Sequence, residues 1–290
     1  MRFIAVSQPG AGNFLHAVPS RKPFQLQSWA MGIAVQRRLG LPLSTALNKM
    51  HRFGRHGQPL DALGDVALAD GKGGHATRHH GLLTCLKQVL APVYGSTRVA
   101  TEPDDHLDYN AAHRPDLVIY GAGIGGTMLV LDLKIFGPVP ADLNSLCPRG
   151  RRVAFGNTHP RAVEQVVGLA ERGVPECGKW DALTGSGYVA PVRGDYAQAQ
   201  AQGLTVAPLL FEAFGGFGPE VMTLLGDAAR HVRDKLTSAQ YEETTWAARK
   251  WTPFAVQQIS VALQRELAWA VGREHGLPVG GGADPRPAGG

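Results

Sequence analysis

Two short apolar runs, joined by a glycine-rich turn, constrain the fold of this chain more than any other feature. The runs occupy residues 114–120 and 128–134, and four glycines stand in the turn between them, at 121–126. Glycine adopts positive φ without steric cost, so the pattern predicts a β-hairpin. Side chains on a strand alternate between its two faces, so Asp132 and Lys134 point the same way. Folding the hairpin then brings Asp116 beside Asp132.

This arrangement of charged side chains suits a particular chemistry. Asp116 and Asp132 repel each other unless a cation lies between them, and carboxylate oxygens favour a hard ion such as Mg²⁺ (or Mn²⁺). Lys134 can hold a water or a phosphate oxygen at the same place, so the set suits metal-assisted hydrolysis of a phosphodiester. The alternative is a hairpin whose acids only mark strand ends in solvent. Against it, alternation places Leu131 and Leu133 on the opposite, apolar face.

Composition sets the outer limits. A chain of 290 residues with 44% hydrophobic content is long enough for one large domain or two small ones and is globular. The apolar runs are too short for a membrane span or a signal peptide, so we expect a soluble, intracellular protein with no membrane partner. Three widely spaced cysteines form neither a disulfide framework nor a zinc-ligand pair.

The positive charge of the chain permits a polyanionic partner without requiring one. The formal net charge is +5, and the sequence pI is about 9.2. Basic residues lie on both sequence flanks of the hairpin, at Arg21-Lys22, Arg37-Arg38, His51–His56, Arg78-His79-His80 and Arg149–Arg152.

Periodicity predicts an α/β chain with a helical C-terminal part. The expected elements are a helix at 25–39, a loop-like stretch at 51–77, a helix at 79–93, a strand at 97–101, the hairpin, helices at 160–172 and 195–202, and a strand at 205–214. We expect four segments: an N-terminal arm at 1–76, a core at 77–217 with an insertion at 136–194, a helical segment at 218–277 interrupted near Pro253, and a disordered tail at 278–290.

The motifs of the chain resemble a known family. Arg114-Pro-Asp116 and Asp132-x-Lys134 are similar to the PD-(D/E)xK signature of restriction-endonuclease-like nucleases. Further segments resemble the C-terminal endonuclease region of non-LTR (LINE-type) retrotransposons, and they cover residues 5 to 215 in the family's order. These segments are Gly10–Pro19, Arg37–Pro42, Leu60–Ala69 with Gly73-Gly74, Arg78-His79-His80, and Pro208–Glu212 followed by Ala-Phe-Gly-Gly.

The resemblance implies a fold and a function. The fold would be a restriction-endonuclease-like αβββαβ core with a mixed sheet, plus C-terminal helices. The activity would be a Mg²⁺-dependent DNA endonuclease that nicks a strand and leaves a 3′ hydroxyl. The implied partner is double-stranded DNA, with a possible homodimer, in the nucleus.

The resemblance also assigns roles to single residues. Asp116 and Asp132 would be the metal ligands, and Lys134 would orient the attacking water or stabilise the charge on phosphorus. Glu102 would add a further metal ligand or a general base, or be an exposed acid in a charged turn. The implied DNA-contacting residues are Arg78, His79 and Arg114, although Arg78 and His79 could equally form an ordinary solvated helix start.

The sequence leaves the roles of two later residues, Glu212 and Tyr196, undecided. Glu212 lies in an apolar strand, where an unpaired carboxylate costs several kcal/mol, so we expect it to pair with Arg78 or the metal site. Tyr196 either packs or touches a phosphate, and packing is the preferred interpretation.

The chain departs from the family pattern in its zinc knuckle. The expected Cys/His ligands correspond to His51, Phe53, Val66 and Asp70, and neither phenylalanine nor valine can bind zinc. We therefore expect a degenerate knuckle without zinc. His51, His56 and Asp70 could improvise a site.

The reverse transcriptase of such elements is also missing, which would make the chain a fragment, a decayed copy or a host gene derived from one. The alternative function is therefore a catalytically inactive remnant, a basic DNA-binding or scaffold protein. A small-ligand pocket under the glycine turn is a weaker alternative, because the Gly-x-Gly-x-x-Gly spacing is not met.

Overall fold

The computed structural model describes residues 6–43, 53, 57, 59–69, 74–103, 114–137, 166–167, 194–243 and 248–276. Four strands form one mixed sheet in the order β1 (Val99–Thr101), β2 (Leu117–Ile119), β3 (Leu129–Phe136) and β4 (Thr205–Glu212). β1, β2 and β3 pair antiparallel, whereas β3 and β4 run parallel. The predicted α/β class with a mixed sheet is confirmed.

The glycine turn between β2 and β3 has the conformation that its sequence requires. Gly121, Gly125 and Gly126 have φ values of 73°, 67° and 78°. At Gly123 a Cβ atom would lie 2.5 Å from Thr127 Oγ1 and 2.6 Å from the carbonyl oxygen of Met128. The turn therefore needs glycine for backbone conformation at three positions and for space at the fourth.

The sheet carries a helical layer on one face and a smaller cover on the other. Leu131 and Leu133 join the main core with α4 (Gly74–Tyr94), α7 (Pro219–His231) and α9 (Trp251–Glu274). Val130 and Leu210 belong to a second cluster with α6 (Ala197–Ala201). Asp132 and Lys134 alternate with the leucines, so they face the α6 side.

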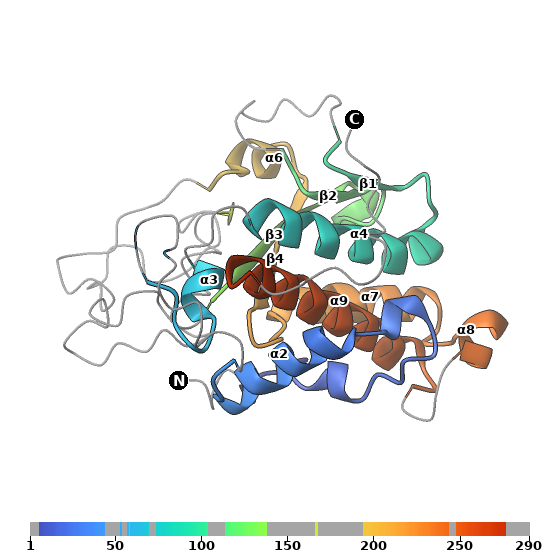
Figure 1. The fold of residues 1–290 in the computed structure, drawn as a ribbon. Coiled ribbons are helices and arrows are strands. Elements are labelled where there is room, and N and C mark those ends of the chain that lie inside the picture. Colours follow the sequence, from blue (N-terminus) through green and yellow to red (C-terminus); the bar gives the residue numbers. More distant parts are fainter. Residues whose placement is uncertain are drawn as a thin grey trace, which may run out of the picture.

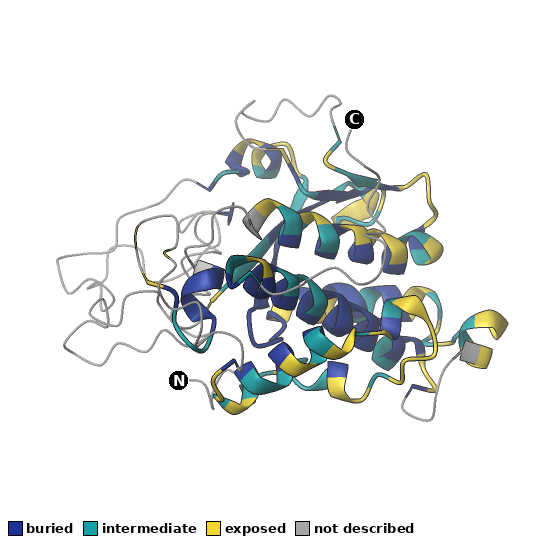
Figure 2. Ribbon diagram, viewed as in Figure 1, coloured by how far each residue is buried: buried dark blue, intermediate teal, exposed yellow. Residues whose placement is uncertain are grey.

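The long helix α9 lies between α4 and α2 (Ser28–Leu39), as Figure 1 shows. It is buried on almost every side, in contrast to the half-exposed α2 and α4 (Figure 2). Its buried side chains include the polar Gln257, Gln258 and Gln264 as well as apolar ones, so α9 is the central helix of the core. Buried side chains from Ala30 to Val271 form one continuous cluster, which therefore includes residues of the predicted arm, core and C-terminal segment.

The N-terminal arm is held against α9 by a buried serine. Ser260 Oγ accepts a hydrogen bond of 3.0 Å from the backbone N–H of Phe14 and donates one of 3.4 Å to the carbonyl of Gly10. Arg38 donates to the carbonyls of Ala11 and Val6 at 2.7 and 2.9 Å. The arm is therefore part of the fold through hydrogen bonds to side chains far away in the sequence.

The predicted order of core elements, helix, three strands, helix, strand, agrees with the structure. The helix predicted at 25–39 is α2, which ends at Gly40 in the left-handed conformation with φ 70°. The strand predicted at 205–214 is β4. Two boundaries differ, because α4 starts at Gly74 instead of residue 79, and the short helix α3 (Asp65–Ala69) lies within the predicted loop.

The helices outside the core were predicted less accurately than the core elements. The helices are interrupted near Pro253, as predicted, because α8 (Ser238–Glu243) ends before α9 begins at Trp251. Pro253 itself stands in the first turn of α9, where a missing N–H costs no helical hydrogen bond. The break between α7 and α8 was not predicted. The helix predicted at 160–172 is described only at residues 166–167, which are helical, and the tail lies outside the described residues.

The remaining predictions concern the zinc-knuckle positions, the cysteines and the absence of a membrane span. Of the knuckle positions, Phe53 is exposed, Val66 is buried in α3, and His51 and Asp70 lie outside the described residues. Cys85 is a buried free thiol whose pKa is raised to about 12 by burial, as expected of an idle cysteine. Among the described helices, none is both long and apolar enough to cross a membrane.

Candidate metal and phosphodiester site

Asp116 occupies the position at which β2 begins. The pairing of Leu117 with Leu131 places Asp116 opposite Asp132 in the next step of the register. Asp116 Oδ2 accepts a hydrogen bond of 2.5 Å from the backbone N–H of Leu133 and lies 3.0 Å from His79 Nε2. The hairpin therefore brings the two aspartates to the same end of the sheet, as the sequence predicted.

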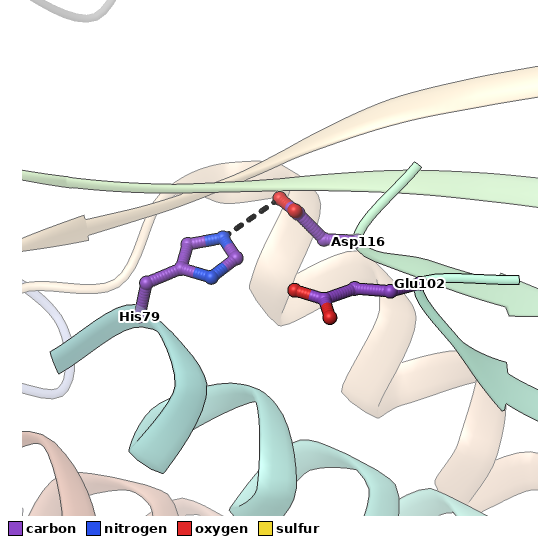
Figure 3. A group of neighbouring side chains, drawn as sticks. All are labelled: His79, Glu102 and Asp116. Carbon is purple, nitrogen blue, oxygen red and sulfur yellow. Dashed lines mark ion pairs between the residues drawn. The ribbon is translucent and has the colours of Figure 1, made fainter. Parts of the chain in front are cut away.

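Three side chains from different elements gather around Asp116. His79 comes from α4, Glu102 follows β1, and their ligand atoms and that of Asp116 all lie within 4.8 Å of one another (Figure 3). We call His79, Glu102 and Asp116 the acidic cluster. Within the part of the chain that the structure describes, this is the one group of three His, Cys, Asp or Glu side chains placed closely enough to hold a metal ion.

Glu102 enters this cluster with a strained backbone. Its φ is +44°, a left-handed conformation that side chains other than glycine rarely adopt. Its N–H donates a 3.0 Å hydrogen bond to the carbonyl of Asp116, which holds the two acidic residues together. Such strain persists only where neighbouring contacts over-determine the conformation, and it concentrates at functional sites.

The pKa of His79 is shifted by both acids of the cluster. Its pKa is raised, mainly by the hydrogen bond to the Asp116 carboxylate and further by the charges of Asp116, Glu102 and Asp132, while burial opposes the rise. His79 was predicted to contact DNA, and the structure instead places its ring against Asp116. A His and two carboxylates form a donor set that can hold a divalent metal ion.

Asp132 lies next to the acidic cluster with a separate set of partners. Its side chain is 8% exposed, and Oδ2 lies 2.9 Å from Lys134 Nζ. Tyr196 Oη lies 2.9 Å from Asp132 Oδ1 and 3.0 Å from the carbonyl of Arg114, so its single proton serves one of these acceptors at a time. The pKa of Asp132 is raised by burial and by the charge of Asp116, and Lys134 and Tyr196 oppose this rise.

The sequence singled out Tyr196 but did not predict its partner. The tyrosine is 2% exposed, so packing, the preferred interpretation, is confirmed. Its pKa is raised by burial and by the neighbouring carboxylates, above all Asp132, so it remains a hydrogen-bond donor. Asp132 and Tyr196 are 64 positions apart in the sequence, which explains why no local pattern revealed this contact.

The residues predicted to contact DNA occupy three different environments. Arg78 is only 3% exposed and donates a 3.1 Å hydrogen bond to the carbonyl of Leu68. Burial and the charge of Arg37 lower its pKa to about 10. This burial argues against a phosphate contact for Arg78. Arg114 is exposed beside the site, and His79 belongs to the acidic cluster.

Glu212 was predicted to pair with Arg78 or with the metal site. The carboxyl group is 0% exposed at the end of β4, and neither oxygen has a hydrogen-bond partner among the described residues. Burial alone raises its pKa to about 8, so the group is largely protonated at neutral pH. The predicted pairing is therefore not observed, and protonation takes its place as the way to avoid a buried charge.

Comparison of the chain with protein-family models, with curated proteins and with solved structures found no match. The resemblance to retrotransposon endonucleases therefore depends on the motifs quoted above. Any functional assignment depends on the geometry of the acidic cluster and of the Asp132–Lys134 pair.

Proposed function

We propose that this protein is a Mg²⁺- or Mn²⁺-dependent DNA endonuclease with a restriction-endonuclease-like core, derived from a retrotransposon. The observation that carries the proposal is the position of the acidic cluster next to an ion pair on β3. His79, Glu102 and Asp116 approach within 4.8 Å, and Asp132 with Lys134 stands one register step away. Carboxylates, an imidazole and an ammonium at one place suit phosphodiester hydrolysis better than a purely structural role.

The side chains of the acidic cluster would hold the metal ion. A divalent ion bound there would withdraw charge from a phosphate oxygen and lower the pKa of a coordinated water. The contribution of the chain is to fix the ligands: the N–H of Leu133 orients Asp116, and the N–H of Glu102 bonds to the Asp116 carbonyl. Fixed ligands need no reorganisation at the moment of reaction.

Asp132 and Lys134 supply the proton acceptor and a positive charge. Burial raises the pKa of Asp132, which makes its carboxylate a stronger base toward a water molecule. The Lys134 side chain is 34% exposed, so its ammonium group can donate to a phosphate oxygen that arrives from solvent. The water oxygen then bonds to phosphorus while the bond to the 3′ oxygen breaks. The 3′ oxygen takes a proton from solvent, which leaves a 3′ hydroxyl and a 5′ phosphate.

The test is nicking of supercoiled plasmid by the purified protein with Mg²⁺, Mn²⁺ or EDTA. We expect metal-dependent nicking that is lost in Asp132→Ala and in Lys134→Ala. Asp227→Asn and Lys87→Ala serve as controls, because Lys87 is exposed, the side chain of Asp227 is 44% exposed, and both belong to helices, α4 and α7, away from the strand ends.

Thermal unfolding of every variant separates loss of activity from loss of folding. A folded wild-type protein that does not nick with either metal, and that binds DNA equally well after both substitutions, contradicts the catalytic proposal. That result would favour the inactive DNA-binding remnant.

A further inference from the structure

Three arginines upstream of the hairpin are engaged within the fold. Arg37 is 3% exposed and pairs with Asp65 at 3.0 Å. Arg38 bonds to backbone carbonyls, and Arg78 is buried. These three arginines are therefore not offered to a polyanionic partner, whereas another group of cations among the described residues is exposed.

This group of cations lines a pocket of about 620 Å³ between the end of α7, α8 and the start of α9. Four of its lining residues are exposed cations, which we call the basic pocket residues: Arg233, Lys235, Arg249 and Lys250. The ring of Tyr241 lines the same pocket and is 63% exposed.

Two acids also line the pocket, and one of them has a structural function. Asp234 Oδ1 accepts hydrogen bonds from the backbone N–H and the hydroxyl of Thr252, at 2.9 and 2.8 Å, in the first turn of α9. Its other oxygen lies 3.8 Å from Lys250 Nζ. Glu242 is the second acid and is exposed. The four cations therefore exceed the two acids, and one acid is already bound to a helix N-terminus.

The backbone around the pocket is fixed in an unusual conformation. Arg233 and Asp234 are consecutive non-glycine residues with φ of +56° and +52°. The Asp234 N–H donates to the carbonyl of Ala229 at 2.7 Å, and its carbonyl accepts from Trp251 at 3.2 Å. Strain of this kind marks segments whose geometry serves a further purpose.

The helix that carries Tyr241 is also held in place. The backbone N–H of Gln240 donates to Thr237 Oγ1 at 3.2 Å, and the N–H of Thr237 donates to Gln240 Oε1 at 3.0 Å. This reciprocal pair is a capping box, which fixes the start of α8. The backbone that carries Tyr241 is therefore fixed at the start of α8.

We propose that the basic pocket binds a single-stranded segment of DNA, with phosphates on the basic pocket residues and a base stacked on Tyr241. Cations interleaved with an exposed aromatic ring are the usual means of binding single strands without regard to sequence. The inference rests on the proposed function, because it takes DNA as the partner. The inference adds to that function the place at which an unpaired strand next to the nick is held.

The pocket lies at the opposite end of α4 from the acidic cluster. The ring of Tyr94, near the end of α4, is 4.9 Å from that of His231, which ends α7 two residues before Arg233. From His79 to Tyr94 the helix rises about 22 Å. A strand with the spacing of about 3.4 Å per nucleotide found in a duplex covers this distance with roughly six to seven nucleotides. Substitutions in the pocket therefore do not touch the proposed catalytic groups.

The test is the affinity of the full chain for fluorescein-labelled single-stranded and duplex oligonucleotides, measured by anisotropy in EDTA. In Lys235→Ala/Arg249→Ala we expect single-strand binding to weaken about tenfold or more, and the slope of log K against log salt to fall by about 1.4 for two lost phosphate contacts. Tyr241→Ala should weaken it about fivefold or more, while Tyr241→Phe retains the stacking ring and the affinity.

The control removes two exposed lysines elsewhere, Lys22→Ala/Lys87→Ala, with the same change in net charge. An equal loss in this control, unchanged affinity in the pocket variants, or binding of duplex alone overturns the inference. Because EDTA prevents metal binding, the outcome is independent of catalysis. If the protein nicks plasmid but the pocket variants bind single strands as the wild type does, only the inference about the pocket is contradicted. If binding depends on the pocket but no nicking is seen, only the catalytic proposal is contradicted.

Discussion

Two regions of the same sheet bury carboxyl groups in opposite ways. At the start of β2 and within β3, Asp116 and Asp132 receive hydrogen bonds from a backbone amide and a tyrosine hydroxyl, and they lie beside His79 and Lys134. At the end of β4, Glu212 is surrounded by the chain without a partner among the described residues. A Cβ atom at Gly216 would lie 3.0 Å from Glu212 Oε2, so the neighbouring turn closes over it.

The difference shows what a buried acid needs to keep its charge. Each hydrogen bond or cation near Asp132 opposes the rise in pKa that burial causes, whereas at Glu212 burial acts alone and raises the pKa to about 8. The first region therefore holds charge available for chemistry, and the second holds a neutral acid inside the fold. The predictions below test this contrast, from the largest expected effect to the smallest.

Asp116→Asn should have the largest effect, because it removes the carboxylate that contacts both His79 and the backbone N–H of Leu133, between Asp132 and Lys134. We expect the nicking rate to fall by about 10²- to 10³-fold, the range typical for loss of one preorganised electrostatic group. The Mn²⁺-dependent rise in melting temperature expected of the wild type should also disappear. Unchanged stabilisation by Mn²⁺ in the variant would place the metal elsewhere.

The second prediction concerns the pH dependence of stability. Because the pKa of Glu212 is about 8 in the folded chain and near 4.5 when unfolded, the folded state binds the extra proton between these values. The contribution of Glu212 to stability is therefore fully present at and below about pH 4.5 and is lost as the pH rises towards 8, by about 1.4 kcal/mol per pH unit.

Urea unfolding between pH 5 and 8 measures this slope. Glu212→Gln keeps the shape of the side chain without an ionisable group, so it should flatten the dependence, whereas exposed Glu242→Gln should not. An equal slope in wild type and Glu212→Gln would show that Glu212 is not protonated in the fold.

Tyr196→Phe removes the hydroxyl that contacts Asp132 and leaves the packing of the ring. We expect the nicking rate to fall about tenfold, as for other groups that orient a functional residue, and stability to fall by about 1 kcal/mol. The pKa of Asp132 should rise further, so the pH at which activity is half-maximal should rise as well. A pH–rate profile of both proteins measures this shift. A uniform loss at every pH would show that the hydroxyl does not act through the pKa of Asp132.

His79→Gln should have the smallest effect, a change in metal preference. Imidazole favours Mn²⁺ over Mg²⁺ more than oxygen ligands do, and Gln offers an oxygen at nearly the same reach. We expect the ratio of nicking with Mn²⁺ to nicking with Mg²⁺ to fall several-fold. Exposed His80→Gln, on the adjacent position of α4, is the control. The same ratio in wild type and His79→Gln would exclude His79 from the ligand set.

Local patterns predicted the parts of the structure that neighbouring residues determine. The helix ending at Gly40 and the hairpin followed from apolar periodicity and from glycine conformation. The side-by-side placement of Asp132 and Lys134 followed from strand alternation. The five-residue helix α3 is too short to carry a periodic signal and was missed.

Contacts between distant segments could not be predicted from such patterns. The sequence indicated that His79 and Tyr196 matter, but their partners Asp116 and Asp132 depend on how α4 and α6 pack on the sheet. The environment of Glu212 was wrongly predicted for the same reason, because the expected partner Arg78 turns towards the carbonyl of Leu68. The sequence supplied the charged groups, and tertiary packing selected which of them meet.

The attachment of the N-terminal arm to Ser260 has a consequence for how the chain is made. Phe14 and Ser260 are 246 residues apart in the sequence, so this bond cannot form until almost the entire described chain has been synthesised. At typical translation speeds, the arm waits roughly 12 to 50 seconds for its partner helix to emerge. During this interval the apolar face of α2 that α9 will cover stays open to water. A nascent chain of this kind is a natural client for chaperones that bind exposed apolar segments.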